Sequence, residues 1–187
     1  MSERHEHCIV GIDPGAKGGI AFYFPSAPGM VSVEDMPMIG KQVNGAALAL
    51  RLIQMRPTLA VVESVHAMPK QGVTSSFNFG HSVGSVHGVL AGQGIPLHLV
   101  APGMWKKHFR LPKDKEAARA LAVRLWPSCD GFKRKLDHNR AEAALLARYG
   151  AETMFKAMMV RDESGIPVDM EYAAADWLLE TVDKVRA

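Results

Sequence analysis

The sequence predicts an α/β fold: a mixed five-stranded sheet, in which a three-strand meander is followed by parallel strands, with helices on both faces. Two observations predict it. Three short apolar segments separated by turns come first, and from residue 45 onward apolar strands alternate with helical segments. Strands that alternate with helices form sheets covered on both sides, because each crossover helix packs against one face.

The predicted meander occupies residues 7–37. Residues 7–13 are an apolar run that ends at Asp13, and a Gly/Pro turn at 14–19 joins them to a second strand at 20–24. Two strands joined by such a turn form a hairpin. Residues 30–37 add the third strand, which Pro37 closes.

Helical spacing dominates the rest of the chain. A helix is predicted over 45–55, before Pro57, and a second over 75–94, with a serine cap at its start and glycines at its end. The small residues of 75–94 allow another backbone to approach closely. The other predicted elements are strands over 59–65 and 97–102 and helices over 104–109, 115–127 and 139–150.

Length and composition predict one main domain, residues 1–150, and an acidic helical extension, residues 151–187, of the 187-residue chain. The chain is 48% hydrophobic and 22% charged, which is typical of a globular protein and excludes disordered and collagen-like classes. No apolar run approaches the ~18 residues of a membrane span, and the start lacks the pattern of a secretory or transit peptide. Cys8 and Cys129 are too few for a disulfide framework, so we expect a cytoplasmic protein.

The positive charge is concentrated in one segment. Residues 101–140 carry eleven Lys/Arg against four Asp/Glu, a net charge of +7, whereas residues 1–100 carry six of each and residues 141–187 carry five against nine. A basic block favours a polyanionic partner such as nucleic acid, because neutralised phosphates release counterions. The alternative is a solvated helix face balanced by the acidic C-terminal residues.

Two acidic residues end predicted buried strands. Asp13 closes the first strand, and Glu63 stands where an apolar residue would extend the strand after Val61 and Val62. A carboxylate at the end of a central strand costs desolvation energy unless a partner such as a bound cation compensates it. The alternatives are an Asx-turn for Asp13 and a strand end that reaches solvent for Glu63.

A third acidic cluster lies at residues 136–150, where Glu142 stands among apolar residues in the first turns of a predicted helix. At ~100° per residue, His138 and Glu142 share a helix face. Asp137 converges with Glu142 only if it lies in the loop before the helix. The alternative for Glu142 is a capping box with Asn139 as the N-cap residue.

These segments carry a resemblance. GIDPGAKGGIAF, VVESVHAMPKQGVTSSFNFGHSVG, LVAPGMWKKHF and LDHNRAEAALLARYG resemble the RuvC-like Holliday junction resolvases, and most of all the branch with the plant chloroplast resolvase and related phage and bacterial proteins. The resemblance covers about residues 7–150. The Asp-Pro-Gly turn alone is weak, but the KQG-to-FG stretch together with DH-x-RAEA is specific.

The resemblance implies an RNase H-like fold and a homodimer that cuts four-way DNA junctions symmetrically with magnesium or manganese, in DNA recombination and repair. It places metal ligands at Asp13, Glu63, Asp137 and Glu142. Bacterial RuvC has an acidic or histidine ligand three residues before the last one, where this chain has Asn139; the chloroplast-type pattern matches Asp137 and His138 instead. We therefore expect Asp137 as the fourth ligand, with His138 as its substitute or partner.

Phosphodiester hydrolysis fits such a ligand set, because two divalent ions ~3.5–4 Å apart activate water and stabilise the leaving oxygen. The expected catalytic residues are the four acids and His138, whose alternative is an exposed residue at a helix start. No nucleotide cofactor and no membrane partner is expected.

The residues expected to contact DNA are basic, except for one aromatic and one amide side chain. They are Lys70, Gln71, Phe77, Lys106, Lys107, Lys133, Arg134, Lys135 and Arg140. The alternative for Lys70 is a solvated loop lysine, and for Phe77 and Phe79 it is core or dimer packing. Trp105 is expected to anchor the core. The helix over 75–94 is the expected dimer interface.

Three other functions compete with junction cleavage. One is an RNase H-like nuclease acting on other branched DNA or on RNA/DNA hybrids. Another is an ATP-binding actin-like module, suggested by the Gly-rich turn after Asp13, although that fold needs two such halves and would leave Glu63 and Asp137 without a role. The third is a junction-binding protein without catalytic activity, which the complete acidic set disfavours.

Overall fold

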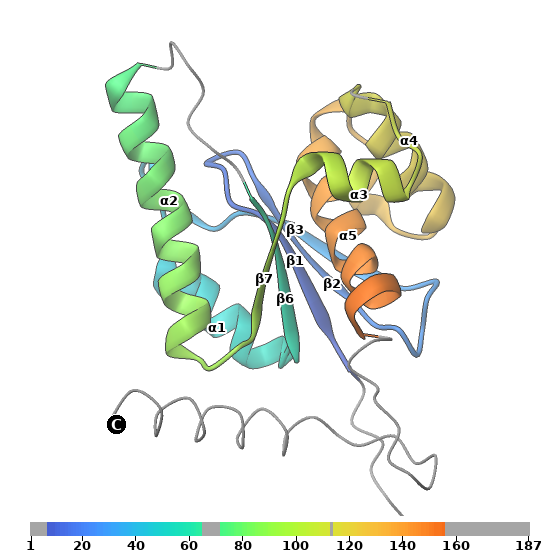
Figure 1. Ribbon diagram of the computed structural model, residues 1–187, viewed down its shortest axis with the longest axis horizontal. Coiled ribbons are helices and arrows are strands. Elements are labelled where there is room, and N and C mark those ends of the chain that lie inside the picture. The colour runs from blue at the N-terminus through green and yellow to red at the C-terminus, as the bar shows by residue number, and fades with distance from the viewer. Residues whose placement is uncertain (1–6, 65–71, 113, 156–187) are drawn as a thin grey trace, which may run out of the picture. The chain divides into compact units, whose positions relative to one another are not determined.

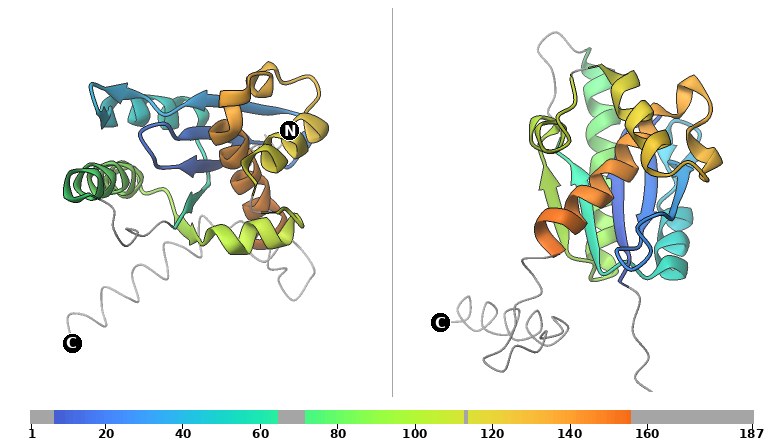
Figure 2. Two further views of the ribbon diagram at one scale, coloured as in Figure 1. Left: turned by 90° about the horizontal axis from the view of Figure 1, so that it is seen from above. Right: turned by 90° about the vertical axis from the view of Figure 1, so that its right-hand side faces the viewer.

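The computed structural model describes residues 7–64, 72–112 and 114–155, without the side chains of residues 115 and 155. A central sheet lies between two groups of helices, α1 and α2 on one face and α3, α4 and α5 on the other (Figure 1). The view from above in Figure 2 shows the same layers. The predicted α/β fold with helices on both faces is confirmed.

The central sheet has the strand order β3-β2-β1-β6-β7. Its meander pairs β1 with β2 and β2 with β3 antiparallel, whereas β6 and β7 lie parallel to β1 on its other side. A two-stranded sheet, β4 (Met38–Ile39) with β5 (Gln42–Val43), was not predicted. The five main strands are β1 (Ile9–Asp13), β2 (Gly19–Tyr23), β3 (Val31–Asp35), β6 (Leu59–Glu63) and β7 (Leu97–Val100).

One face of the sheet packs on α1 (Gly45–Met55) and α2 (Val73–Gly92). Alternate strand residues point to opposite faces, so Val10 and Ile12 of β1 join Leu48 and Val86 of these helices in the core cluster. Asn44 caps α1 by accepting a hydrogen bond from the backbone N–H of Ala47. This cap and the arrest of α1 before Pro57 explain why its predicted bounds match the structure.

The other face packs on α5 (His138–Gly150), which is covered in turn by α3 (Pro102–His108) and α4 (Lys115–Leu125). Two 3₁₀ turns, Asp130–Phe132 and Lys135–Asp137, lead into α5, and a π-helical turn, Ala151–Phe155, follows it. Nine of the thirteen residues of α5 are buried. The helix is therefore a core element rather than a surface one.

Glycines allow α5 to lie directly on the meander. A Cβ added to Gly11 of β1 would be 2.0 Å from the backbone oxygen of Ala143, and one added to Gly19 of β2 would be 2.9 Å from the Cα of Arg140. No larger residue fits at either position without moving the helix. This close approach fixes the first turns of α5 over the carboxyl end of β1.

One predicted detail, the serine cap of α2, and one alternative, the capping box at Asn139, are wrong. The N-cap of α2 is Gly72 rather than a serine, because the helix begins at Val73, before the serines. Asn139 is not the N-cap of α5, because the helix begins at His138. The side-chain amide of Asn139 donates to the backbone oxygen of Lys17 instead.

The chain divides into two units after Gly150. Residues 156–187 lie outside the described residues, so the acidic helical extension stays a prediction. No helix in the described part of the chain combines the length and apolar character needed to cross a bilayer.

Candidate active site

Asp13 and Glu63 stand side by side at the carboxyl ends of neighbouring parallel strands. Ile12 of β1 is paired with Val62 of β6, so the next position in register on each strand is one of these two acids. Gly11 and Val61, two residues earlier on each strand, face α5. A Cβ added to Gly11 would contact the backbone of α5, and a Cβ added to Gly150 of α5 would contact the side chain of Val61. By the period of two, Asp13 and Glu63 point to the same face.

Glu142 reaches this region from α5. It lies in the second turn of the helix and is 6% exposed. The Nζ atom of Lys106 in α3 lies 3.1 Å from its Oε1, an ion-pair distance, but the geometry is not that of a hydrogen bond and this buried oxygen has no hydrogen-bond partner. A buried carboxylate oxygen with one charge nearby and no donor suits a further cation.

Glu63 interacts electrostatically with both Asp13 and Glu142. Its Oε1 accepts a 2.9 Å hydrogen bond from the indole N–H of Trp105. The pKa of Glu63 is raised to about 7. Burial is the main cause, and the negative charges of Asp13 and Glu142 add to it, whereas the Trp105 hydrogen bond and Lys106 oppose the rise. Three carboxylates from β1, β6 and α5 therefore share one electrostatic environment.

Asp13 takes part both in the turn that follows β1 and in this acidic cluster. The backbone N–H of Gly15 donates to Oδ1 of Asp13 at 3.3 Å, which is the Asx-turn that the sequence offered as an alternative. The turn holds the carboxylate at the strand end, and its charge still acts on Glu63. The structural and the electrostatic interpretations of Asp13 are compatible.

Asp137 is held by arginines. Its carboxylate, 2% exposed, accepts hydrogen bonds from the Arg134 backbone at 2.8 Å and from the Arg134 guanidinium at 2.7 and 2.9 Å. Burial opposes ionisation, but these bonds and the charges of Arg134 and Arg140 outweigh it and lower the pKa of Asp137. Asp137 does lie in a turn before the helix, as required for convergence with Glu142, but it is engaged by Arg134 there. Its role as a ligand stays a prediction.

His138 opens α5 one turn before Glu142, on the same face by the i, i+4 rule. Its Nδ1 lies 3.3 Å from the backbone oxygen of Lys135, where a neutral ring with Nδ1 protonated would donate. The other ring nitrogen, Nε2, is then an acceptor. The predicted catalytic role of His138 is compatible with this placement and stays a prediction.

The carboxylates fit a hard divalent cation in chemistry, because Mg²⁺ and Mn²⁺ prefer oxygen ligands and their charge offsets the repulsion among the acids. Nevertheless, across the described ranges no three Asp, Glu, His or Cys side chains are close enough together to ligate one ion as they stand. Trp105 and Lys106 partner two of the acids instead. The fit therefore rests on the donor set, on the buried oxygen of Glu142 and on the raised pKa of Glu63.

The predicted DNA-contacting residues divide into three groups. Lys107 and Lys135 are exposed, as is Phe77 at 70%. Lys106, Lys133, Arg134 and Arg140 form ion pairs with Glu142, Asp130, Asp137 and Asp35 respectively, and the Arg140 pair joins α5 to the end of β3. Lys70 and Gln71 lie outside the described residues.

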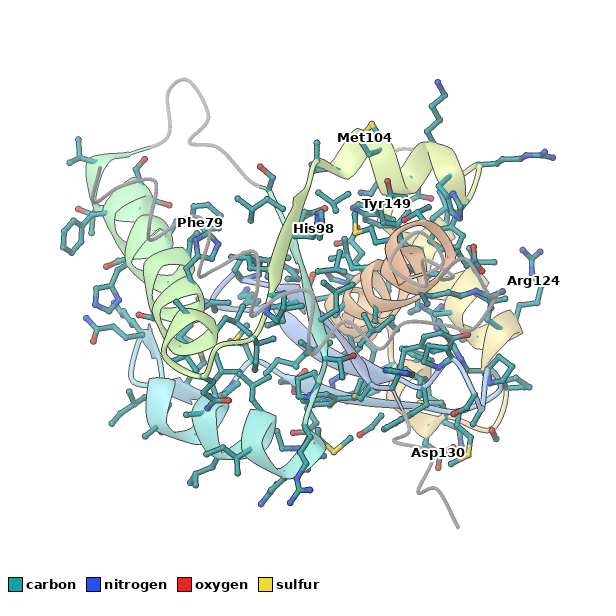
Figure 3. All side chains as sticks on the ribbon, turned by 60° about the horizontal axis from the view of Figure 1, so that its bottom comes forward. Phe79, His98, Met104, Arg124, Asp130 and Tyr149 are labelled. Carbon is teal, nitrogen blue, oxygen red and sulfur yellow. The ribbon has the colours of Figure 1, made fainter. Side chains whose placement is uncertain are left out.

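A groove of about 470 Å³ lies between the turn after Asp13 and α2. Ala16 lines one wall and Thr74, Asn78 and Phe79 line the other. Figure 3 shows Phe79 on the side of α2 that faces the sheet. This half-buried placement matches the packing alternative for Phe79, whereas Phe77 remains available to a partner.

Comparisons with known proteins bear on the fold. No protein-family model and no curated protein matches this chain. The structure of T. thermophilus RuvC in complex with a Holliday junction substrate matches with a TM-score of 0.61 at 16% sequence identity, over 78% of this chain and 94% of that chain. The chain has the RuvC fold. A structure of Thermus thermophilus RuvC gives a TM-score of 0.55 at 14% identity, over 78% of this chain and 95% of that one.

The RuvC fold confirms the predicted RNase H-like architecture, while the chloroplast-type and phage branch stays a prediction. Sequence reasoning missed the roles of two adjacent residues. Trp105 is a core anchor, as predicted, but it also donates to Glu63; Lys106 was predicted to contact phosphate and pairs with Glu142. A signal was present for Trp105, because a buried indole N–H requires an acceptor.

Proposed function

We propose that this protein is a divalent-metal-dependent endonuclease that cuts four-way DNA junctions by phosphodiester hydrolysis. One observation carries the proposal. Asp13, Glu63 and Glu142 share one electrostatic environment at the carboxyl ends of β1 and β6, in a chain with the RuvC fold. The same acids have no evident role in a protein that only binds DNA.

In this proposal Asp13, Glu63 and Glu142 hold the ions, and Asp137 joins them if Arg134 releases it. Two bound Mg²⁺ or Mn²⁺ ions supply a nucleophilic water and stabilise the leaving oxygen. His138 presents Nε2 as an acceptor on the Glu142 face of α5 and orients a water or a leaving group. Lys106 balances the negative charge of the acids before metal binds, as its 3.1 Å distance from Glu142 indicates.

The substrate follows from charge and symmetry. Lys107 and Lys135 are exposed cations on the basic segment, and they suit the phosphates of DNA. A four-way junction has two equivalent cut sites, so a two-fold dimer of this chain fits it. Helix α2 supports such a dimer, because a Cβ added to Gly80, Gly84 or Gly88 would have no atom within 4 Å, and Phe77 is exposed on the same helix.

The test is cleavage of a mobile four-way junction with each strand labelled in turn, in MgCl₂. We expect paired, symmetric cuts in two opposite strands, no cleavage in EDTA, and at least a hundredfold slower cleavage by Asp13→Asn, by analogy with the loss of other essential catalytic groups. Duplex, flap and RNA/DNA hybrid substrates serve as controls. Cleavage by Asp13→Asn at the wild-type rate, or preferential cleavage of a hybrid, would refute the proposal.

A further inference from the structure

Helix α3 presents two consecutive side chains to the acidic cluster. Trp105 is 0% exposed and donates its indole N–H to Oε1 of Glu63 at 2.9 Å. Lys106 places its ammonium 3.1 Å from Glu142 and 4.9 Å from the centroid of the Trp105 ring. The indole is thus fixed by the core on one side and by two polar contacts on the other.

A core anchor does not require this acceptor. The chain offers a comparison in Trp126, which is also 0% exposed and donates at 3.1 Å to the backbone oxygen of Pro28. A backbone carbonyl is the ordinary acceptor for a buried indole, because it satisfies the N–H without burying a charge. Trp105 instead donates to an ionisable carboxyl group at the end of β6, beside Asp13 in register.

The bond restricts what the Glu63 carboxyl group can do. An indole N–H is a donor only and carries no charge, so it occupies Oε1 without neutralising the carboxylate. Glutamate has three rotatable bonds, and its headgroup turns freely about the last of them unless a partner holds it. With Oε1 held by a buried ring, rotation of the carboxylate is restricted and Oε2 is left for another partner.

We propose that Trp105 is a positioning residue, which orients Glu63 so that Oε2 is presented to a divalent cation. The proposal rests on the proposed function, because it assumes that Glu63 is a metal ligand. Hydrogen-bond partners of metal-ligating carboxylates commonly change metal affinity by ~10–100-fold when they are removed. Trp105 acts on the metal only through Glu63, since it has no atom that ligates a cation.

The experiment measures Mn²⁺ binding to the full chain by titration calorimetry at pH 8, without DNA. Trp105→Phe keeps most of the ring and removes the N–H, and Trp126→Phe is the matched control for the loss of a buried indole. We expect binding at least ~10-fold weaker for Trp105→Phe and within about twofold of wild type for Trp126→Phe, whatever the change in thermal stability. Equal Mn²⁺ affinity in Trp105→Phe and wild type would overturn the proposal.

Two further variants separate a failure of this inference from a failure of the proposed function. If Trp105→Phe does not fold, benzothienylalanine at position 105 keeps the shape and lacks the N–H; the same ~10-fold loss is expected, and unchanged affinity overturns the proposal. Glu63→Gln tests the ligand itself. Wild-type affinity in Glu63→Gln, or no Mn²⁺ binding by the wild-type chain, contradicts the metal site as a whole; loss in Glu63→Gln with none in Trp105→Phe contradicts only the role of Trp105.

Discussion

Removing the charge of Glu63 should stabilise the protein in the absence of metal. The pKa of Glu63 in the folded protein is about 7, against its ordinary value of 4.5. Between these values the folded state binds a proton that the unfolded state does not, so unfolding releases it. The stability contributed by this group is complete below the lower value and is lost as the pH rises through the upper one.

The magnitude follows from the size of the shift. A rise from 4.5 to about 7 corresponds to at most about 3.5 kcal/mol, at about 1.4 kcal/mol per unit of pKa. Because Glu63 is partly exposed, solvent screening reduces this value, and we expect about 1–3 kcal/mol. Glu63→Gln keeps an acceptor for the Trp105 N–H and removes the charge. At pH 8 its melting temperature should exceed that of wild type by about 2–12 °C.

The assay is thermal unfolding followed by circular dichroism in EDTA, from pH 4.5 to pH 8.5. The difference between Glu63→Gln and wild type should be near zero at the acid end and grow through pH 7. Glu116→Gln is the control, because Arg119 lowers the pKa of Glu116 and its effect should not grow in this range. A difference that is constant with pH, or a less stable Glu63→Gln at pH 8, would refute the raised pKa of Glu63.

Three further predictions test the frame around the site. Gly11→Ala should destabilise the protein by at least about 2 kcal/mol in urea unfolding, because its Cβ would lie 2.0 Å from the Ala143 oxygen; an unchanged midpoint contradicts the packing. Lys107→Ala should weaken junction binding and flatten its salt dependence by about one unit of slope, and an unchanged slope in fluorescence anisotropy excludes a phosphate contact. Asp35→Asn should lower the free energy of unfolding by about 1 kcal/mol, because it weakens the bidentate ion pair with Arg140. Wild-type stability in the same urea assay would show that this ion pair does not stabilise the fold.

The sheet was predictable because its signals are local. The turn at 14–19 reverses the chain between two apolar strands, and Pro37 and Pro57 end their elements. Helix α2 was predicted two residues too late at both ends, over 75–94 instead of Val73–Gly92, since its start at Val73 has no side-chain cap to mark it. The second sheet, β4 with β5, was missed because strands of two residues carry no periodicity.

The acidic site was predictable in part, for a different reason. Asp13 and Glu63 are anomalies within their own strands, so each is visible without knowledge of the fold. The hydrogen bonds from Arg134 to Asp137 could not be predicted. The sequence places an aspartate three residues after an arginine, and this spacing does not decide whether the carboxylate faces a metal ion or that arginine. Only the local geometry of the turn decides between them.

The contribution of α3 shows where sequence reasoning ends. Trp105 and Lys106 are neighbours in a helix, so their side chains point in directions ~100° apart, and no periodic pattern assigns both to one site. Both reach the acids because α3 lies close to α5 and to the end of β6, so that Glu142 and Glu63 approach it from two elements. A residue pair that looks like one core anchor and one phosphate contact thus supplies a neutral donor to one acid and a positive charge to another. These two contacts depend on how α3 packs against the rest of the protein, and that packing is determined by the sheet and all its helices together rather than by the local sequence.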